Sequence, residues 1–424
     1  MIISKDTDIA FSGLIWKIIK NSTICQSRFG SFISAPPTLI VVENPEFSFK
    51  KDPYINVYDE AYYQRFEILV QEIAEKLKNT PFTRRASIPI WRPADHLTIN
   101  PPAITEISFL IDDGKLHLTA FLRSLDCLNY FFINFDFLLT CLEKVSKLTE
   151  NELGSLGMLI SIPHIYVRDK ERAETFAKRV KEKYGYHHLA THLVEDYISS
   201  AWHTALDVII QNGKKKRTEW GEFFSGQENT LSIHRMLIEV VNPEENKIHD
   251  KAPFTRKYGV EYAHNYVIYA AKMFEEVKGP ILNRNEEYTY AERARYCEKD
   301  NPKVDQLYTS VIKLKGDRCR RDCYVGISRY WDILSSDPPC LRGYQFFKFN
   351  DTLYSVFYMR SNDAYGAMHA NMFAFSILSK YVAEFLGIKN YRYVHFALDA
   401  HVYEQFIDAV KDILYPSSPS FQFK

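Results

Sequence analysis

One set of residues occurs twice in this chain with the same internal spacing. In the second half the set runs Pro338-Pro339-Cys340, Arg360-Ser361-x-Asp363, Asn371 and His401-x-Tyr403. In the first half it runs Pro101-Pro102-Ala103, Arg123-Ser124-x-Asp126, Asn134 and His164-x-Tyr166, each residue 237 positions earlier. So many polar and aromatic positions in register predict two copies of one domain. Within this set the copies differ at one position, where the second copy has Cys340 and the first has Ala103.

The repeat extends to the start of each copy. A helical pattern over residues 11–21 matches one over residues 202–212. A buried-strand pattern closed by Asn-Pro matches between residues 39–45 and 237–243. We therefore expect one domain over residues 1–190 and a second over residues 191–424.

An arginine pair followed by an apolar strand also occurs in both copies. The first pair, Arg84-Arg85, matches Arg320-Arg321 at an offset of 236. The second copy is longer before its pair, and the extra length includes residues 258–296, which are dense in Tyr, Arg and Glu. The copy with the cysteine thus also has the additional segment.

Local patterns predict the elements around the motifs. After Cys340 we expect a hairpin that turns at Asn350-Asp351, and then a long helix over residues 368–386 that ends at Gly387. The charged stretch over residues 170–195 has helical spacing and is expected to bridge the copies.

Composition narrows the class of protein. The chain has 424 residues, is 46% hydrophobic and carries no net formal charge, so no global field recruits nucleic acid. Its seven cysteines form no paired framework, which suits a reducing, cytoplasmic location. No apolar run reaches membrane-spanning length. The C-x3-C of Cys319 and Cys323 has no second pair at finger spacing, so no metal is expected.

Cys340 is the candidate nucleophile. A free cysteine beside apolar strands is usually a small core residue. Here the sister copy has alanine at this position, so packing does not require the sulfur. Arg360 lies on the adjacent hairpin strand, where its charge would favour the thiolate.

The other repeated residues suit a nucleotide. A guanidinium and a hydroxyl, from Arg360 and Ser361, make a phosphate clamp. The amide of Asn371 can both donate and accept, as reading a uracil edge requires. We expect His401 and Tyr403, which alternate on one strand face, to contact a sugar hydroxyl or the ring.

These residues, with the Asp-Pro-Pro-Cys around Cys340 and the Asp-Ala-His-Val-Tyr ending at Tyr403, resemble thymidylate synthase and its pyrimidine hydroxymethylase relatives. The stretch 288–293 is similar to archaeal-type members of this family. The resemblance implies an α/β (α+β) protein of two tandem domains, whose twisted mixed sheets pack back to back under covering helices. Since the family forms homodimers, it implies a fused internal pseudo-dimer that works as a monomer.

The resemblance also implies roles across the two copies. In the family an arginine pair from the partner subunit helps to hold the phosphate, so Arg84 and Arg85 would reach the Cys340 site. Arg217 falls at the family's phosphate-loop arginine. The thiolate of Cys340 would add to C6 of the pyrimidine and activate C5 toward a one-carbon unit. Tyr290 and a carboxylate would manage protons at C5.

The carboxylate candidates are Glu239 and Asp363. The implied donor is 5,10-methylenetetrahydrofolate or a related reduced pterin, and the expected reaction converts dUMP to dTMP. Two alternatives stay open. One is a dUMP, dCMP or CMP hydroxymethylase that forms the same adduct, and the other is a non-catalytic nucleotide-binding or regulatory protein.

Overall fold

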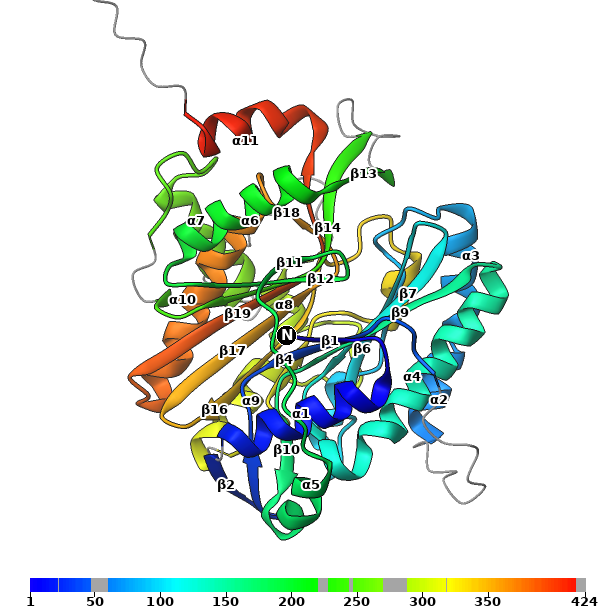
Figure 1. Ribbon diagram of the computed structural model, residues 1–424. Coiled ribbons are helices and arrows are strands. Elements are labelled where there is room, and N and C mark those ends of the chain that lie inside the picture. Colours follow the sequence, from blue (N-terminus) through cyan, green and yellow to red (C-terminus); the bar gives the residue numbers. More distant parts are fainter. Residues whose placement is uncertain are drawn as a thin grey trace, which may run out of the picture.

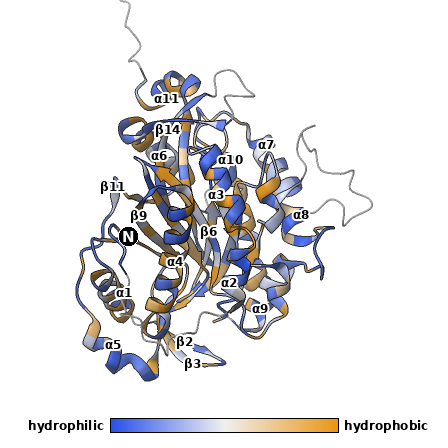
Figure 2. Cartoon of the chain, turned by 90° about the vertical axis from the view of Figure 1, so that its right-hand side faces the viewer, coloured by the Kyte–Doolittle hydropathy of each residue, from blue (hydrophilic) through white to orange (hydrophobic). Residues whose placement is uncertain are grey.

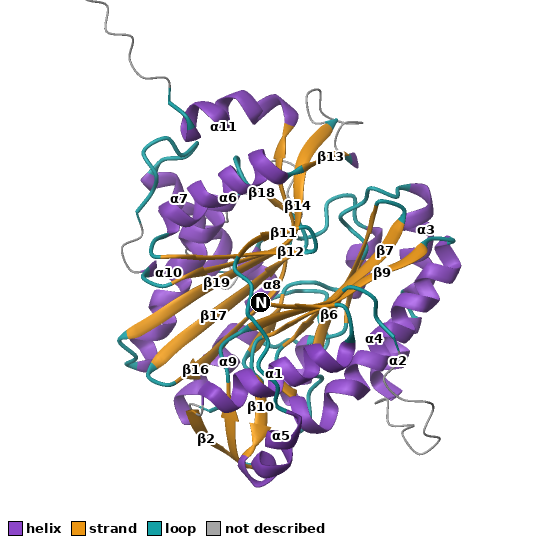
Figure 3. Ribbon diagram, in the orientation of Figure 1, coloured by secondary structure: helices purple, strands orange, loops and turns teal. Residues whose placement is uncertain are grey.

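The computed structural model describes residues 1–21, 23–46, 60–219, 228–243, 247–269, 288–317 and 319–416. These residues form two lobes, one from each half of the chain, each with a sheet at its centre (Figure 1). The two sheets lie toward the middle of the molecule and the long helices cover their outer sides (Figure 3). The fold is the predicted one, a mixed α/β structure of two tandem domains.

The first lobe contains a six-stranded and a four-stranded sheet. The six-stranded sheet has the order β1 (Ile2–Ser4), β4 (Thr38–Val42), β9 (Glu152–Ile160), β7 (Lys115–Leu122), β6 (Ile104–Asp112) and β5 (Ser87–Pro89). The four-stranded sheet has the order β2 (Thr23–Ser27), β3 (Gly30–Ser34), β10 (Pro163–Tyr166) and β8 (Leu125–Asp126). Its α-helices are α1 (Thr7–Asn21), α2 (Glu60–Glu67), α3 (Val70–Asn79), α4 (Cys127–Thr149) and α5 (Lys170–Phe176).

The second lobe is built on one nine-stranded sheet. Its main path runs β11 (Gly185–His187), β12 (Ala190–Glu195), β14 (Asn229–Val240), β19 (Asn390–Tyr403), β17 (Thr352–Met359), β16 (Leu341–Phe349) and β15 (Tyr324–Gly326). Two further strands pair with β14 and β19, namely β13 (Lys214–Arg217) and β18 (Asn362–Asp363). Its α-helices are α6 (Ile198–Asn212), α7 (Arg256–Tyr262), α8 (Tyr290–Arg295), α9 (Gln306–Gly316), α10 (Met368–Leu386) and α11 (Ile407–Leu414).

Prolines explain why the first lobe has two sheets where the second has one. The strands β3 and β4 of the first lobe are separated by Pro36 and Pro37, which have no backbone N–H for a sheet ladder. The second lobe has Arg235 in the matching stretch, and β14 continues through it. Arg235 adopts a positive φ of 51°, and the pairing of β14 with β19 skips this residue.

The expected hairpin and helix after Cys340 are confirmed. The strands β16 and β17 pair antiparallel and turn between Phe349 and Thr352. Helix α10 ends at Leu386, and Gly387 follows with a φ of 65°, a left-handed cap that glycine adopts without strain.

The expected helix over residues 170–195 is wrong beyond its first two turns. Helix α5 ends at Phe176, and residues 185–195 form β11 and β12 instead. The strand β12 pairs in parallel with β14, so long-range pairing outweighs the local charge spacing. It takes the same place beside β14 as β1 takes beside β4, and we propose the boundary between the copies here.

The offset of the arginine pairs also needs correction. The strands β5 and β15 pair with β6 and β16 at residues 237 positions apart, as Ser87 with Ser108 and Tyr324 with Gln345. Counting back from these strands, Arg84 is the counterpart of Arg321. Arg85 therefore corresponds to Asp322 and not to a second arginine.

The two sheets pack directly on each other through an apolar core. That core draws Leu39, Val41 and Phe121 from the first lobe, and Val356 and Phe396 from the second. Hydrophobic residues concentrate on the central strands, while the outer faces of the helices are largely hydrophilic (Figure 2). The predicted back-to-back arrangement is therefore confirmed.

A buried arginine of the second lobe reaches across this contact. Arg235 of β14 donates to Thr119 Oγ1 at 2.7 Å, to Ser155 Oγ at 2.8 Å and to Leu118 O at 2.9 Å, all in the first lobe. Burial lowers its pKa to about 10. Because its N–H groups donate to residues of the first lobe, this guanidinium helps to hold the two sheets together. Within the described ranges, no helix is both long enough and apolar enough to cross a membrane.

Candidate active site

A cavity of about 290 Å³ lies where the second lobe meets residues 82–85 of the first. Most of the residues predicted from the repeat line it together. They are Cys340, Tyr290, Asp363, Arg360, Ser361, Asn371, His401, Tyr403, Arg84 and Arg85. Residues from both halves of the chain thus form one candidate site.

The guanidinium of Arg360 holds the segment that carries the cysteine. It donates through Nε to Pro339 O at 3.1 Å and through Nη2 to Pro338 O at 2.5 Å. Its backbone N–H donates to Cys340 O at 2.9 Å. Because one buried guanidinium holds two successive carbonyls, it fixes where Cys340 emerges.

Arginines of the first lobe complete the wall around the thiol. Arg360 Nη1 donates to Arg84 O at 3.1 Å, which joins the two lobes at the cavity. Arg85 lies with Nε 2.8 Å from Glu219 Oε2, and its charge interacts with Cys340. The cavity thus has a guanidinium from each lobe in its lining together with Cys340.

Asp399 organises the cations and the histidine beside them. Its Oδ1 lies 3.4 Å from Arg84 Nη1 and 3.0 Å from His401 Nδ1. Burial opposes its ionisation, but hydrogen bonds from His234 and His401 and the charge of Arg84 hold the pKa of Asp399 well below its ordinary value. The sequence did not single out Asp399, although it lies two residues before His401 on the same strand face.

His401 presents an unused nitrogen to the cavity. Burial, together with the charge of Arg84, lowers the pKa of His401, so the ring is neutral at pH 7. Its Nε2 is buried and has no hydrogen-bond partner among the described residues. A ligand hydroxyl or carbonyl would satisfy this atom, because orphaned buried polar groups are costly.

Asn371 is oriented by a tyrosine of the additional segment. It lies in the first turn of α10, and its Oδ1 accepts from Tyr262 Oη at 2.8 Å. With Oδ1 occupied, Nδ2 is the part of the amide left to donate to a ligand. Tyr262 was not predicted as a site residue, although the density of tyrosines in its segment was noted.

Stacked tyrosines form the opposite wall. The rings of Tyr258 and Tyr262 lie 6.1 Å apart and those of Tyr262 and Tyr266 5.1 Å apart, with interplanar angles of 6° and 21°. Tyr266 meets Tyr290 edge to face at 4.9 Å. Such a row of flat, polarisable faces suits a planar heterocycle such as a reduced pterin.

Tyr290 is the innermost of these rings and stays protonated. Burial raises its pKa well above the ordinary value, and the neighbouring Cys340 raises it further. Its hydroxyl accepts a long hydrogen bond of 3.4 Å from Leu341 N. A neutral phenol beside the thiol can donate a proton or hold a water molecule there.

Asp363 shapes the turn that leads into α10. Its Oδ1 accepts from the backbone N–H groups of Tyr365 and Gly366, both at 3.0 Å. Ser361 lines the cavity two residues earlier. The structure therefore gives Asp363 a positioning contact, while its carboxylate still borders the cavity.

Two predicted residues lie elsewhere. Glu239 is absent from the cavity lining, and its Oε1 pairs with Arg392 Nη1 at 2.6 Å on the neighbouring strand. It was chosen for its closeness in sequence, but the register of β14 and β19 turns it to Arg392. We therefore withdraw Glu239 as a catalytic candidate.

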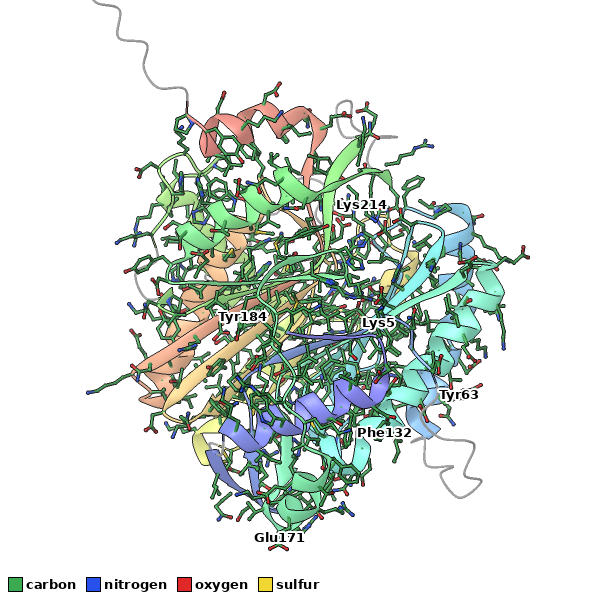
Figure 4. All side chains as sticks on the ribbon, in the orientation of Figure 1. Lys5, Tyr63, Phe132, Glu171, Tyr184 and Lys214 are labelled. Atoms are coloured by element: carbon green, nitrogen blue, oxygen red, sulfur yellow. The ribbon has the colours of Figure 1, made fainter. Side chains whose placement is uncertain are left out.

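Arg217 lines an adjoining cavity and not the one that contains Cys340. Its guanidinium lies 5.3 Å from the ring of Phe82, which borders both cavities. The lysine run before it forms β13. Lys214, which is labelled in Figure 4, lies 3.0 Å from Asp112 of the first lobe. The ring of Phe82 therefore lies between Arg217 and the cavity that contains Cys340.

No group of three or more His, Cys, Asp and Glu side chains within the described part of the chain could hold a metal ion. The chemistry available in the cavity is that of a thiol, three guanidinium groups, an oriented amide and neutral phenols. This combination suits nucleophilic attack on a planar, anionic ligand.

Comparison with known proteins agrees with this chemistry. A family model described as thymidylate synthase matches residues 55–218 and again residues 220–422. A relative from Methanocaldococcus jannaschii, named "Putative thymidylate synthase", is 28% identical over 49% of this chain and 87% of its own length. Relatives of the same name from Methanococcoides burtonii and Methanosarcina mazei are 26% identical, each over 51% of this chain and 91% of its own length. Each relative therefore corresponds to about one lobe.

Proposed function

The chain belongs to the thymidylate synthase family, and we propose that it transfers a one-carbon unit to C5 of dUMP and so forms dTMP. The observation that carries this proposal is the composition of one cavity. Cys340 shares it with arginines of both lobes, whereas the equivalent position of the first lobe is Ala103.

The proposed reaction begins at the sulfur. The thiolate of Cys340 adds to C6 of the pyrimidine, and the electron pair of the C5–C6 double bond moves toward the carbonyl oxygen at C4. An N–H donor aimed at that oxygen stabilises the charge as it develops. Asn371 Nδ2 is suited to this task because Tyr262 already occupies the amide oxygen.

Bond formation at C5 follows from this addition. C5 attacks the one-carbon unit, the bond between that carbon and its donor breaks, and C5 loses its proton. Addition of a hydride or of water to the new exocyclic carbon then moves electrons through the ring, so that the C6–S bond breaks and releases Cys340. We assign the proton movement at C5 to Tyr290, whose hydroxyl is neutral and borders the thiol. When bound, 5,10-methylenetetrahydrofolate or a related reduced pterin supplies the one-carbon unit and, for a methyl product, a hydride. The stacked tyrosines would hold its ring.

Tyr262 also favours uracil over cytosine. Uracil has a carbonyl at C4, which accepts, while cytosine has an amino group there, which donates. An asparagine fixed to donate through Nδ2 matches the carbonyl and leaves two donors opposed on cytosine. This argument supports dUMP over dCMP as substrate.

The phosphate and the sugar have partners in the same cavity. Arg85, Arg360 and Ser361 provide charged and hydroxyl donors for the phosphate, with Arg84 held ready by Asp399. His401 Nε2 would accept from or donate to the sugar hydroxyl, next to Tyr403. Because both lobes are in one chain, we expect a monomer to hold the whole site.

The release of tritium from [5-³H]dUMP in the presence of methylenetetrahydrofolate tests this function. Wild-type protein should release tritium, and Cys340→Ala should abolish the release while it still binds dUMP. Mass analysis of the product separates a methyl from a hydroxymethyl group, and hence the synthase from the hydroxymethylase alternative. Tritium release by Cys340→Ala at the wild-type rate would show that the nucleophile is wrong. Binding of dUMP without any C5 chemistry would favour the non-catalytic alternative.

A further inference from the structure

We propose that the first lobe contains a second nucleotide site, which binds the phosphate of a nucleoside monophosphate but does not transform the base. The site is a cavity of about 1300 Å³ around Ala103. It is lined by counterparts of the candidate catalytic residues and by Arg321 of the second lobe. This site is additional to the Cys340 cavity, and its existence does not depend on the reaction there.

The cavity repeats the arginine geometry of the Cys340 site. Arg123 donates through Nε to Pro102 O at 2.7 Å, and through Nη2 to Pro101 O. Its Nη1 donates to Arg321 O at 2.7 Å. These are the bonds that Arg360 makes to two prolines and to Arg84, so each lobe receives an arginine from the other in the same way.

A tyrosine also repeats. The backbone N–H of Ala103 donates to the hydroxyl of Tyr62 on α2. In the second lobe Leu341, the residue after the cysteine, donates to Tyr290 on α8. The first lobe therefore retains the shape of the site, and the sulfur is the missing part.

The charge balance of the two cavities differs in favour of an anion in the first lobe. Beside the Cys340 cavity, Asp399 lies against Arg84, which lines it. The residue 237 positions before Asp399 is Ile162. In place of a carboxylate, Arg321 contacts Nε2 of His164 and donates to Tyr166 Oη at 2.9 Å.

Neither of these acceptors carries a negative charge. Burial lowers the pKa of His164 well below its ordinary value, so the ring is neutral. Among the described residues, neither Arg123 nor Arg321 forms an ion pair with a carboxylate. Asp322, whose charge acts on Arg123, pairs directly with Lys313 and Arg320. In the part of the chain that the structure describes, five arginines line this cavity against three aspartates, so positive charge is in excess and a ligand anion would balance it.

The ligand class follows from the groups beside these arginines. Ser124 Oγ lies next to Arg123 Nη1 at 3.2 Å, so a hydroxyl accompanies the two cations, as a phosphate monoester requires. Asn134 and Tyr62 line the same cavity at the places of Asn371 and Tyr290. With Ala103 in place of cysteine, a bound nucleotide forms no covalent bond and dissociates unchanged.

Calorimetric titration of the full chain with dUMP, without folate, tests the proposal. Wild-type protein should bind two nucleotides per chain. The matched variants Arg321→Gln and Arg84→Gln should each weaken one site by about tenfold or more, and the double variant should weaken both. Inorganic phosphate should compete at both sites. A single site in wild-type protein that Arg84→Gln weakens and Arg321→Gln leaves unchanged would overturn the proposal.

Further measurements distinguish a misfolded variant, or a site for free phosphate, from the proposed nucleotide site. Circular dichroism shows whether Arg321→Gln is folded. If it is not, Ser124→Ala, a smaller change in the same cavity, takes its place and should weaken nucleotide binding at the same site. Binding of phosphate near Arg321 without competition from dUMP would overturn the assignment to a nucleotide. Two dUMP sites without any tritium release would count against the proposed function and leave this second site standing.

Discussion

Phe121 of the first lobe stacks on Tyr358 of the second, with ring centroids 5.3 Å apart and planes inclined by 5°. These two residues are 237 positions apart, so each ring meets its own counterpart. In symmetric homodimers such a contact marks the two-fold axis of an isologous interface. The single chain thus retains the geometry of a dimer whose subunits are joined.

Arg85 should contribute to substrate binding from the opposite lobe. Arg85→Gln should lower kcat/KM for dUMP by about tenfold to a hundredfold, because a charge-assisted bond to phosphate contributes roughly 1.5–3 kcal/mol. The loss should largely disappear with deoxyuridine, which has no phosphate. Steady-state kinetics with both substrates checks this, and Arg320→Gln, paired with Asp322 on the other side, is the matched control. An equal loss for both substrates would instead indicate a general structural defect.

Tyr262 should determine which base is accepted. Tyr262→Phe removes the hydroxyl that occupies Asn371 Oδ1, so the amide can turn and present either its donor or its acceptor. The preference for dUMP over dCMP should then fall by about tenfold. Competition between the two nucleotides for binding measures this ratio. An unchanged preference would mean that other groups orient Asn371.

The inter-lobe ion pair between Glu106 and Arg342 should affect stability strongly. Glu106 Oε1 lies 2.7 Å from Arg342 Nε, and both side chains are almost fully buried. Glu106→Gln should lower the free energy of unfolding by about 3 kcal/mol, because it leaves a buried cation without its partner. Urea denaturation monitored by fluorescence gives this value. Replacing Glu106 and Arg342 together by apolar residues should cost less than Glu106→Gln alone.

Cys319 should react as a thiolate at unusually low pH. A hydrogen bond from Cys25, across the lobe junction, lowers the pKa of Cys319, although burial opposes this. A lowered pKa keeps the thiolate populated as the pH falls below the ordinary thiol value, so alkylation should decline only at more acidic pH. Mass spectrometry of iodoacetamide labelling against pH tests this. Cys25→Ala should move the labelling midpoint of Cys319 upward.

Local patterns predicted the elements that depend on near neighbours. The hairpin β16–β17 follows from its turn residues, and the end of α10 follows from Gly387. The internal repeat predicted most of the cavity because the same local sequences fold twice.

Contacts between distant residues escaped prediction. Asp399 acquires its role only when Arg84 arrives from the other lobe, 315 residues away in the chain. The tandem arginines permitted an alignment shifted by one residue, which only the pairing of β5 and β15 resolves. Glu239 was misassigned because distance along a strand does not show which side chain faces a cavity.

The two lobes belong to one polypeptide, and this has a consequence for how their two pockets can differ. In a homodimer every substitution appears in both subunits, so a change in one pocket is also made in the other. Here Ala103 and Ile162 could replace a sulfur and a carboxylate on one side while Cys340 and Asp399 persisted on the other. A single chain with two lobes therefore allows two similar pockets to carry different residues within one molecule.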